Sequence, residues 1–384
     1  MRVLFTSVPG VGHLHPMLPL ATALAARGDS VLWATARSGC ERLRGAGVDA
    51  VEAGLDEVDG MGEFHARFPE ARQLAPHELP DFTFPRLFGA VRASAMLEGL
   101  IGIAPRWAPD VVVCDAAELA GPIVANELGV PNATHSFGAL LPAARVVAAA
   151  AEVAPLWVQR GLDPRPFCGC YDHLYLDVYP PSLHAGDASH LGPRQLVRPE
   201  GLATAGEPVP DWVTAAPEAP LLYVTLGTVF SSETVLATVL TAVADLPVRV
   251  VATVGPQGDP DALGAQPPNV HVARYIAQQD LLGHCAAVIS HGGSGTFLAA
   301  LAAGLPQVCL PQAADQFLNA ANAEAAGCAL VIRPAELSLE VVRAAAKRVL
   351  ADGAVRAAAQ RIGHEIASMP FAADAADRLA AIVG

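Results

Sequence analysis

The sequence predicts an α/β protein built from two doubly wound domains that face each other across a cleft. Short β-branched runs alternate with Ala- and Leu-rich helical patterns through both halves of the 384-residue chain, which is typical of βαβ units and parallel sheets. The length favours two domains, since a single hydrophobic core seldom organises more than about 250–300 residues. A proline-rich stretch near the middle separates the two series of strands.

The expected elements of the first half are a strand at 2–8, a helix at 16–27, strands at 30–35 and 111–114, and a helix that ends near 129. Gly28 and Gly129 stand where these helices should stop. Tyr171, Tyr175 and Tyr179 alternate with apolar residues, and this alternation predicts a half-buried strand.

The expected elements of the second half are strands at 221–226, 248–254, 287–290 and 308–310, and a helix at 296–303. Six prolines between 192 and 220, with little periodicity, indicate the connection between the domains. We therefore expect a first domain at 1–200, a linker at 201–220 and a second domain at 221–365. The amphipathic segment 366–384 is expected to form a helix that packs back on the first domain.

Composition excludes several functions. A formal charge of −14 argues against a nucleic-acid partner, because phosphate backbones need clustered Lys and Arg. The single lysine, Lys347, has the setting of neither a P-loop nor a Schiff-base lysine. No run of about 18 apolar residues lacks a charge or a breaker, so we expect no membrane span. The first residues do not have the pattern of a signal peptide.

Seven cysteines, an odd number in a large chain, indicate reduced thiols and hence a cytoplasmic location. Cys168, Cys170 and His173 have spacing that could bind zinc, but no fourth ligand stands at a suitable distance. We therefore expect no metal site and no cofactor.

Residues 287–296 place a strand, a Gly-rich turn and a helix start in immediate succession. Such a turn directs free backbone N–H groups and the positive end of a helix to one point, which suits a pyrophosphate. The alternative is a tight strand-to-helix connection in which His291 is incidental.

The segments 269–278, 291–296, 304–307 and 311–316 together resemble the donor-binding signature of family 1 glycosyltransferases. The resemblance covers nearly the whole chain and is closest to bacterial antibiotic and natural-product glycosyltransferases. It implies the GT-B fold, two facing Rossmann-like domains with the donor mainly on the second. It also implies a nucleotide diphosphate sugar as co-substrate.

The resemblance assigns roles to residues of the second half. His291 would contact the diphosphate, assisted by Thr228 and by backbone groups of Gly293, Ser294 and Gly295. Asp315 and Gln316 would bind the sugar hydroxyls. Tyr275 stands where the family usually has a tryptophan stacked on the nucleobase, Ile276 would meet the base through its backbone, and Gln278 would lie near the ribose.

His13 follows the first strand, and Asp115 ends the strand at 111–114, so both are expected at the carboxyl edge of the sheet where such folds bind ligands. The nearby helix N-terminus disfavours the imidazolium form of His13. Together the two residues resemble the family's His–Asp dyad, although a lone loop histidine is often only solvated. His15, next to Pro16, is interpreted as a helix-start residue.

The resemblance implies a single displacement in which His13 takes the proton of an acceptor hydroxyl and Asp115 stabilises the imidazolium, so that the anomeric configuration inverts. The acceptor is expected to be a hydrophobic natural product. Five phenylalanines in a Pro-interrupted region that cannot form one regular helix would line its pocket, or else form ordinary loop core: Phe64, Phe68, Phe82, Phe84 and Phe88.

The nucleotide of the donor is predicted from one position at which this chain differs from the pattern of the family. Many UDP-sugar members of the family carry a glutamate for the ribose hydroxyls where this chain has Ala299, so we favour a dTDP-activated, deoxygenated sugar. Two rival functions are a nucleotide-sugar epimerase of the same fold and a non-catalytic partner protein. The acceptor, the sugar, the hydroxyl modified and the oligomeric state stay open.

Overall fold

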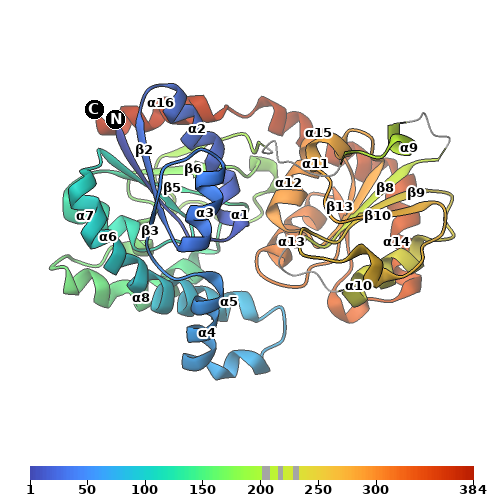
Figure 1. The fold of residues 1–384 in the computed structure, drawn as a ribbon, viewed down its shortest axis with the longest axis horizontal. Helices are drawn as coiled ribbons and strands as arrows, with labels where there is room; N and C mark the ends of the chain where they lie inside the picture. Colours follow the sequence, from blue (N-terminus) through green and yellow to red (C-terminus); the bar gives the residue numbers. More distant parts are fainter. Residues whose placement is uncertain (201–207, 215–218, 228–232) are drawn as a thin grey trace. The chain divides into compact units, whose positions relative to one another are not determined.

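The computed structural model describes residues 1–200, 208–214, 219–227 and 233–384, which divide into two compact units. The first unit comprises Met1–Tyr179, Gly186–Glu200 and Met369–Gly384, and the second comprises Pro180–Ala185 and Gly201–Ser368. Each unit contains one parallel sheet with helices, as the alternation of strand and helix patterns predicts. Figure 1 shows the two sheets and the chain order by colour.

The sheet of the first unit has seven strands in the order β3-β2-β1-β4-β5-β6-β7. Its strands are β1 (Arg2–Thr6), β2 (Ser30–Thr35), β3 (Ala50–Glu52), β4 (Val111–Asp115), β5 (Asn132–His135), β6 (Leu174–Asp177) and β7 (Arg194–Leu196). The order reverses between β1 and β4, which is the switch point at which doubly wound sheets bind ligands.

The helices of the first unit cover its sheet. They are α1 (Val11–Leu14), η1 (His15–Met17), α2 (Leu18–Ala26), α3 (Arg37–Gly45), α4 (Glu57–Arg67), η2 (Pro69–Gln73), α5 (Leu79–Thr83), the π-helical η3 (Phe84–Arg92), α6 (Ala93–Trp107), α7 (Gly121–Leu128), α8 (Ala143–Gln159), η4 (Pro166–Gly169) and α16 (Ala372–Val383). The last of these lies beside α2 (Figure 1), and Arg27 donates to the carbonyl of Ala376 at 2.8 Å.

The second sheet has six strands in the order β10-β9-β8-β11-β12-β13 and reverses between β8 and β11. Its strands are β8 (Leu221–Thr225), β9 (Arg249–Thr253), β10 (Val270–Ala273), β11 (Ala287–Ser290), β12 (Gln307–Cys309) and β13 (Ala329–Val331). The helices of this unit are η5 (Pro181–Leu183), α9 (Asp211–Thr214), α10 (Glu233–Val243), η6 (Pro260–Leu263), α11 (Gln278–Leu282), α12 (Ser294–Ala302), α13 (Gln316–Ala325), η7 (Pro334–Glu336), α14 (Leu339–Ala351) and α15 (Gly353–Ser368).

The expectation of a half-buried strand around Tyr175 is wrong. Strand β6 is buried along its whole length, because β7 pairs with its outer edge and both faces of the sheet are covered. On one face Tyr175 joins a core cluster that contains Trp157 of α8, and α16 contacts the same strand. Parallel sheets buried on both faces lose the alternation of apolar and polar positions.

The aromatic region before β4 is not one regular helix, as its prolines predict, since it is divided among α4, η2, α5 and η3. Residues 79–107 form one helical segment, and its middle part, Phe84–Arg92, is π-helical with Pro85 near its start. A π turn accommodates a position where the regular hydrogen-bond ladder is interrupted. By length and composition alone this helix could cross a membrane, but half of its most apolar window is buried inside the protein, with Met96, Leu97 and Leu100 in the core.

Candidate active site

His13 and Asp115 are brought together by the pairing of two strands. Strands β1 and β4 are parallel neighbours in which Thr6 lies opposite Cys114, so their carboxyl ends meet at one edge of the sheet. Asp115 is the last residue of β4, and His13 lies in the short helix α1 that follows β1 after Gly10. This edge is also the switch point of the strand order, where ligands of doubly wound sheets bind.

Nδ1 of His13 lies 2.9 Å from Oδ2 of Asp115, which is an ion-pair distance. The two atoms lack the angular alignment of a hydrogen bond, and neither has another hydrogen-bond partner in the described part of the chain. Such poor alignment is common in ligand-free active sites. The Asp115 side chain is 1% exposed and that of His13 is 21% exposed, so only the imidazole can reach a ligand.

Three groups surround the imidazole of His13. The ring of Phe137, which follows β5, meets it edge-on with centroids 4.6 Å apart, and the ring of Phe88 lies 6.1 Å away. A Cβ atom on Gly10 would lie 3.1 Å from Cδ2 of His13 and 3.3 Å from Oε1 of Glu57. Phe137 is not among the residues predicted from the sequence, although its place just beyond a strand end is a usable signal.

Two buried titratable groups lie close to the dyad. Burial raises the pKa of Glu118 to about 7, although Thr6 and the backbone N–H groups of Ala120 and Gly121 donate to its carboxylate. Burial lowers the pKa of His135 to about 4, so that its ring, opposite Asp115 in the next strand, is neutral at neutral pH. Neither residue is apparent as a site residue in the sequence pattern.

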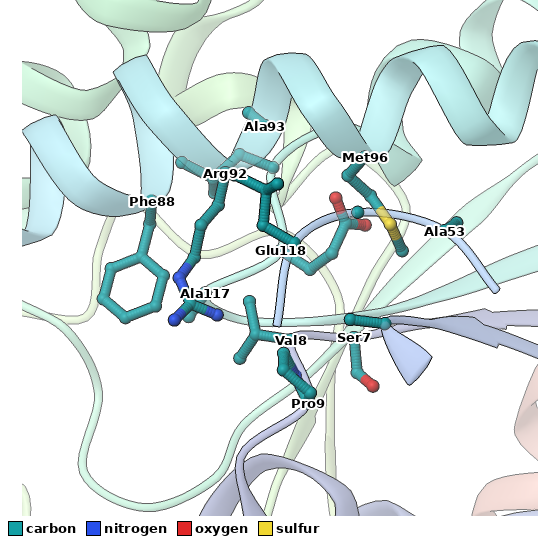
Figure 2. Close-up of a pocket in the computed structure, with 14 residues that line it drawn as sticks. Ser7, Val8, Pro9, Ala53, Phe88, Arg92, Ala93, Met96, Ala117 and Glu118 are labelled. Atoms are coloured by element: carbon teal, nitrogen blue, oxygen red, sulfur yellow. The ribbon is translucent and has the colours of Figure 1, made fainter. Parts of the chain in front are cut away.

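The five phenylalanines expected around the acceptor do not share one environment. Phe64, Phe68 and Phe82 pack against one another with ring centroids 5.7–6.5 Å apart. Phe84 is buried in the main core of the first unit. Only Phe88 lies beside His13, and it also lines a small cavity next to the dyad (Figure 2). The other four phenylalanines pack against one another or in the hydrophobic core.

In the second unit, the Gly-rich turn joins β11 to α12. His291 follows the strand directly, Gly292 has φ +79°, and Gly293 is the residue before the first helical turn. The positive φ suits a glycine at Gly292, since other residues rarely adopt it. The backbone N–H groups of Ser294 and Gly295 therefore belong to the first turn of α12, where they have no partner within the helix.

The imidazole of His291 lies between two glycines. A Cβ atom would lie 2.4 Å from Nε2 if added to Gly293 and 2.6 Å from Nε2 if added to Gly227. The absence of a side chain at both positions thus fixes where the ring can lie. Burial lowers the pKa of His291 to about 4, with Asp315 acting in the opposite direction, so the ring is a neutral hydrogen-bonding group at neutral pH.

Asp315 and Gln316 lie beside the same turn. Oδ2 of Asp315 accepts from the hydroxyl of Ser294 at 2.6 Å and from its backbone N–H at 3.2 Å. The Gln316 side-chain oxygen accepts from the N–H groups of Gln312 and Ala313. Asn319, which the sequence analysis missed, donates to Gly292 and Ser294, and its position four residues after Asp315 on α13 is the signal that could have found it.

The remaining donor residues lie near α11. Ile276 is 1% exposed and belongs to the core, so only its backbone is available to a ligand. The amide nitrogen of Gln278 donates to the hydroxyl of Thr296 at 2.8 Å, while Tyr275 is half-buried. Thr228 lies outside the described residues.

All seven cysteines are free thiols. Nδ1 of His173 lies 2.8 Å from the side-chain oxygen of Asn132, away from any metal-like grouping with Cys168 and Cys170. Within the described ranges, no group of three or more His, Cys, Asp or Glu side chains could hold a metal ion.

Two family descriptions match nearly the whole chain. Residues 22–227 match the N-terminal domain of the erythromycin biosynthesis protein CIII-like family, and residues 237–382 match its C-terminal domain. The L-demethylnoviosyl transferase of Streptomyces niveus is 36% identical over 99% of this chain and 98% of its own. The elloramycin glycosyltransferase of Streptomyces olivaceus is 33% identical over 99% of this chain and 97% of its own.

Solved structures of glycosyltransferases superpose on nearly the whole of this chain. The spinosyn rhamnosyltransferase SpnG superposes with a TM-score of 0.84 at 28% identity, covering 99% of this chain and 100% of that one. Structures of SpnG with thymidine diphosphate and with spinosyn aglycone match with TM-scores of 0.81 and 0.82. The expected GT-B fold of two Rossmann-like domains is therefore confirmed.

Proposed function

This chain belongs to the erythromycin biosynthesis protein CIII-like family of glycosyltransferases, and from that premise we propose that it inverts the anomeric centre of a dTDP-sugar while transferring it to a hydrophobic natural product. The observation that carries the proposal is the His13–Asp115 pair at the switch point of the first sheet, with Nδ1 of His13 2.9 Å from Oδ2 of Asp115. The dTDP complex of SpnG and the antibiotic substrates in the relatives' names support the donor and acceptor classes.

The proposed chemistry is a single displacement. The unprotonated Nε2 of His13 accepts the proton of an acceptor hydroxyl, and the buried Asp115 carboxylate stabilises the resulting imidazolium through Nδ1. The hydroxyl oxygen then forms a bond to the anomeric carbon as the bond to the nucleoside diphosphate breaks. Attack opposite the leaving group inverts the configuration, and NMR of the anomeric proton in the product tests this step.

The proposed donor site accommodates the leaving diphosphate with neutral groups. His291 is neutral at neutral pH, and the backbone N–H group of Gly295 lies in the first turn of α12, where it has no partner within the helix. Donors fixed in advance by the fold stabilise the charge that develops on the departing oxygen. Oδ1 of Asp315 accepts no hydrogen bond within the described ranges, so it is available to a sugar hydroxyl.

The test is mass spectrometry of the pure protein incubated with several nucleotide sugars, each with and without a set of apolar phenols and macrocycles. We expect a mass increase of one sugar on an acceptor and no change of the sugar when donor is supplied alone. A changed sugar without acceptor would support the epimerase, and no product with any pair would favour a non-catalytic partner protein. We propose a cytoplasmic site for the reaction, in keeping with the seven free thiols.

The nucleotide preference gives a first prediction. Ala299 lies half-buried on α12 and packs against the core cluster to which Ile276 belongs, so this position offers no carboxylate to a ribose 2′-hydroxyl. By titration calorimetry we expect dTDP to bind more tightly than UDP, by about tenfold for one lost hydrogen bond to a charged group. Ala299→Glu should reduce or reverse the difference between the affinities for dTDP and UDP, and Ala299→Gln is the uncharged control. Tighter binding of UDP to the unmodified protein would contradict the preference while leaving the transferase activity intact.

Metal removal gives a second prediction. Among the described residues, Asp315 is the one carboxylate that contacts the donor turn, and its Oδ2 already accepts hydrogen bonds from Ser294 and Asn319. The described residues therefore contain no pair of carboxylates that could hold a magnesium ion on a diphosphate. We expect full turnover after exhaustive chelation with EDTA, measured beside samples with restored Mg²⁺ or Mn²⁺. An absolute requirement for either ion would overturn the metal-independent mechanism.

A further inference from the structure

Arg92 is an unusual buried cation next to the dyad. It ends the π-helical segment and is 7% exposed, and its Nε atom has no hydrogen-bond partner. Within the described residues, no hydrogen bond or ion pair satisfies its guanidinium. Buried arginines are almost always paired, because an uncompensated buried charge costs several kcal/mol. A buried cation that lacks a partner is therefore a candidate for binding an anion.

The guanidinium faces a small cavity that the dyad's aromatic neighbour also lines. Phe88 lies near both groups: its ring centroid is 5.8 Å from Cζ of Arg92 and 6.1 Å from the ring centroid of His13. Figure 2 shows the guanidinium directed toward Val8 and Ala117, whereas the Glu118 carboxylate points toward Met96. The cavity volume of about 10 Å³ is enough for one water-sized group.

The other polar side chains that line this cavity already have partners. The hydroxyl of Ser7 accepts from Nε1 of Trp33 at 2.8 Å, and Glu118 accepts from Thr6 and two backbone N–H groups. Glu57, Asp115 and Asp56 act on Arg92 through space and partly offset its burial, but none lies within 4.0 Å of it. Among the polar side chains that line the cavity, Arg92 is thus the one without a hydrogen-bond partner in the described residues.

The backbone of α4 is shaped to admit this guanidinium. A Cβ atom on Gly60 would lie 3.1 Å from Nε and 3.2 Å from Cζ of Arg92. Gly60 therefore leaves a gap that the planar group fills, with the Phe88 ring also nearby. This close approach positions the guanidinium, with which no carboxylate of the described residues pairs directly.

We propose that Arg92 binds an anionic oxygen of the acceptor, a carboxylate or an ionised phenol or enol, and thereby orients the neighbouring hydroxyl toward His13. This inference rests on the proposed transfer to a natural product and defines its acceptor class more narrowly. A protein with a net charge of −14 repels anions in general, so one fixed cation at the site would select acceptors with an acidic group. The planar fork of arginine suits a carboxylate particularly well.

The test compares two probes of equal size, 4-hydroxybenzoate and 4-hydroxybenzamide, by titration calorimetry on the full chain. We expect the benzoate to bind at least tenfold more tightly than the amide. Arg92→Met should abolish this preference and Gly60→Ala should weaken it, since the added methyl group displaces the guanidinium. Equal affinities in the unmodified protein, the same preference in Arg92→Met, or equally tight binding of inorganic phosphate would overturn the proposal.

Thermal unfolding of Arg92→Met separates binding from a structural role. Removing an unpaired buried charge should leave the melting temperature unchanged or raise it, because methionine fills similar space without desolvation of a charge. A lower melting temperature with equal losses for both probes would make Arg92 a structural counter-ion of Glu57 and Asp115. Binding needs no sugar transfer, so charge selection without any glycosylated product would defeat the proposed function alone.

Discussion

Replacing His13 by alanine is expected to lower kcat by about two to four orders of magnitude while the affinity for the nucleotide donor stays nearly unchanged. The imidazole is the only titratable side chain of the dyad that reaches solvent, and Asp115 beneath it is 1% exposed. Loss of the ring removes the proton acceptor and leaves the residues of the Gly-rich donor turn unchanged. Steady-state rates and calorimetric donor titration measure the two quantities separately.

Asp115→Asn should lower kcat as well, because an amide cannot stabilise the imidazolium as a carboxylate does. His15→Ala is the matched control, since His15 lies two residues away in η1 and is not paired with Asp115. Its turnover should stay within a few-fold of the unmodified protein. Near-normal turnover of a folded His13→Ala protein would remove His13 from the mechanism, and the melting temperature shows whether Asp115 tolerates the loss of its partner.

Gly293→Ala is expected to weaken dTDP binding by about a hundredfold, through a change that removes no donor group. The added Cβ would lie 2.4 Å from Nε2 of His291, so the ring must move by about 1 Å and would lose its hydrogen bond to the charged diphosphate, which is worth roughly 1.5–3 kcal/mol. Gly227 closes the other side of the ring in the same way. Calorimetric titration of dTDP measures the effect directly.

Gly295→Ala is the matched control for this prediction. It lies in the same turn and keeps its backbone N–H, but its added Cβ would meet no atom within 4 Å. Its dTDP affinity should be unchanged. If Gly293→Ala acts by moving the ring, the double variant with His291→Ala should bind no more weakly than His291→Ala alone. Additive losses in the double variant, or equal losses at Gly293 and Gly295, would contradict the displacement of His291.

Much of the fold follows from local sequence patterns. Strands β2 and β11 begin and end where their β-branched runs predict, and α7 ends beside Gly129 in the left-handed conformation. These features depend on residues close in sequence, which is why periodicity and glycine placement reveal them. Part of the predicted linker at 201–220 belongs to the second unit: residues 211–214 form α9, and Val213 packs in the core of that unit.

The sequence by itself determined which chemical groups this protein offers. The Gly-rich turn at His291 needs only a strand end, two glycines and a helix start in succession, and all of these are adjacent in the chain. The same holds for the position of His13 after β1. A strand end followed by a helix start has free N–H groups in any fold, so this part of the site does not depend on distant residues.

Only the tertiary structure decided how those groups are combined. His13 meets Asp115 because β1 pairs with β4 rather than with another strand, and no local pattern specifies that pairing. The five phenylalanines look alike in the sequence, but packing buries Phe64 inside a core cluster, whereas Phe88 lies at the margin of that cluster and beside His13. Arg92 is one of many arginines until burial without a partner distinguishes it. Partner choice and burial depend on contacts between segments far apart in the chain, which is the physical reason that they appear only once the chain is folded.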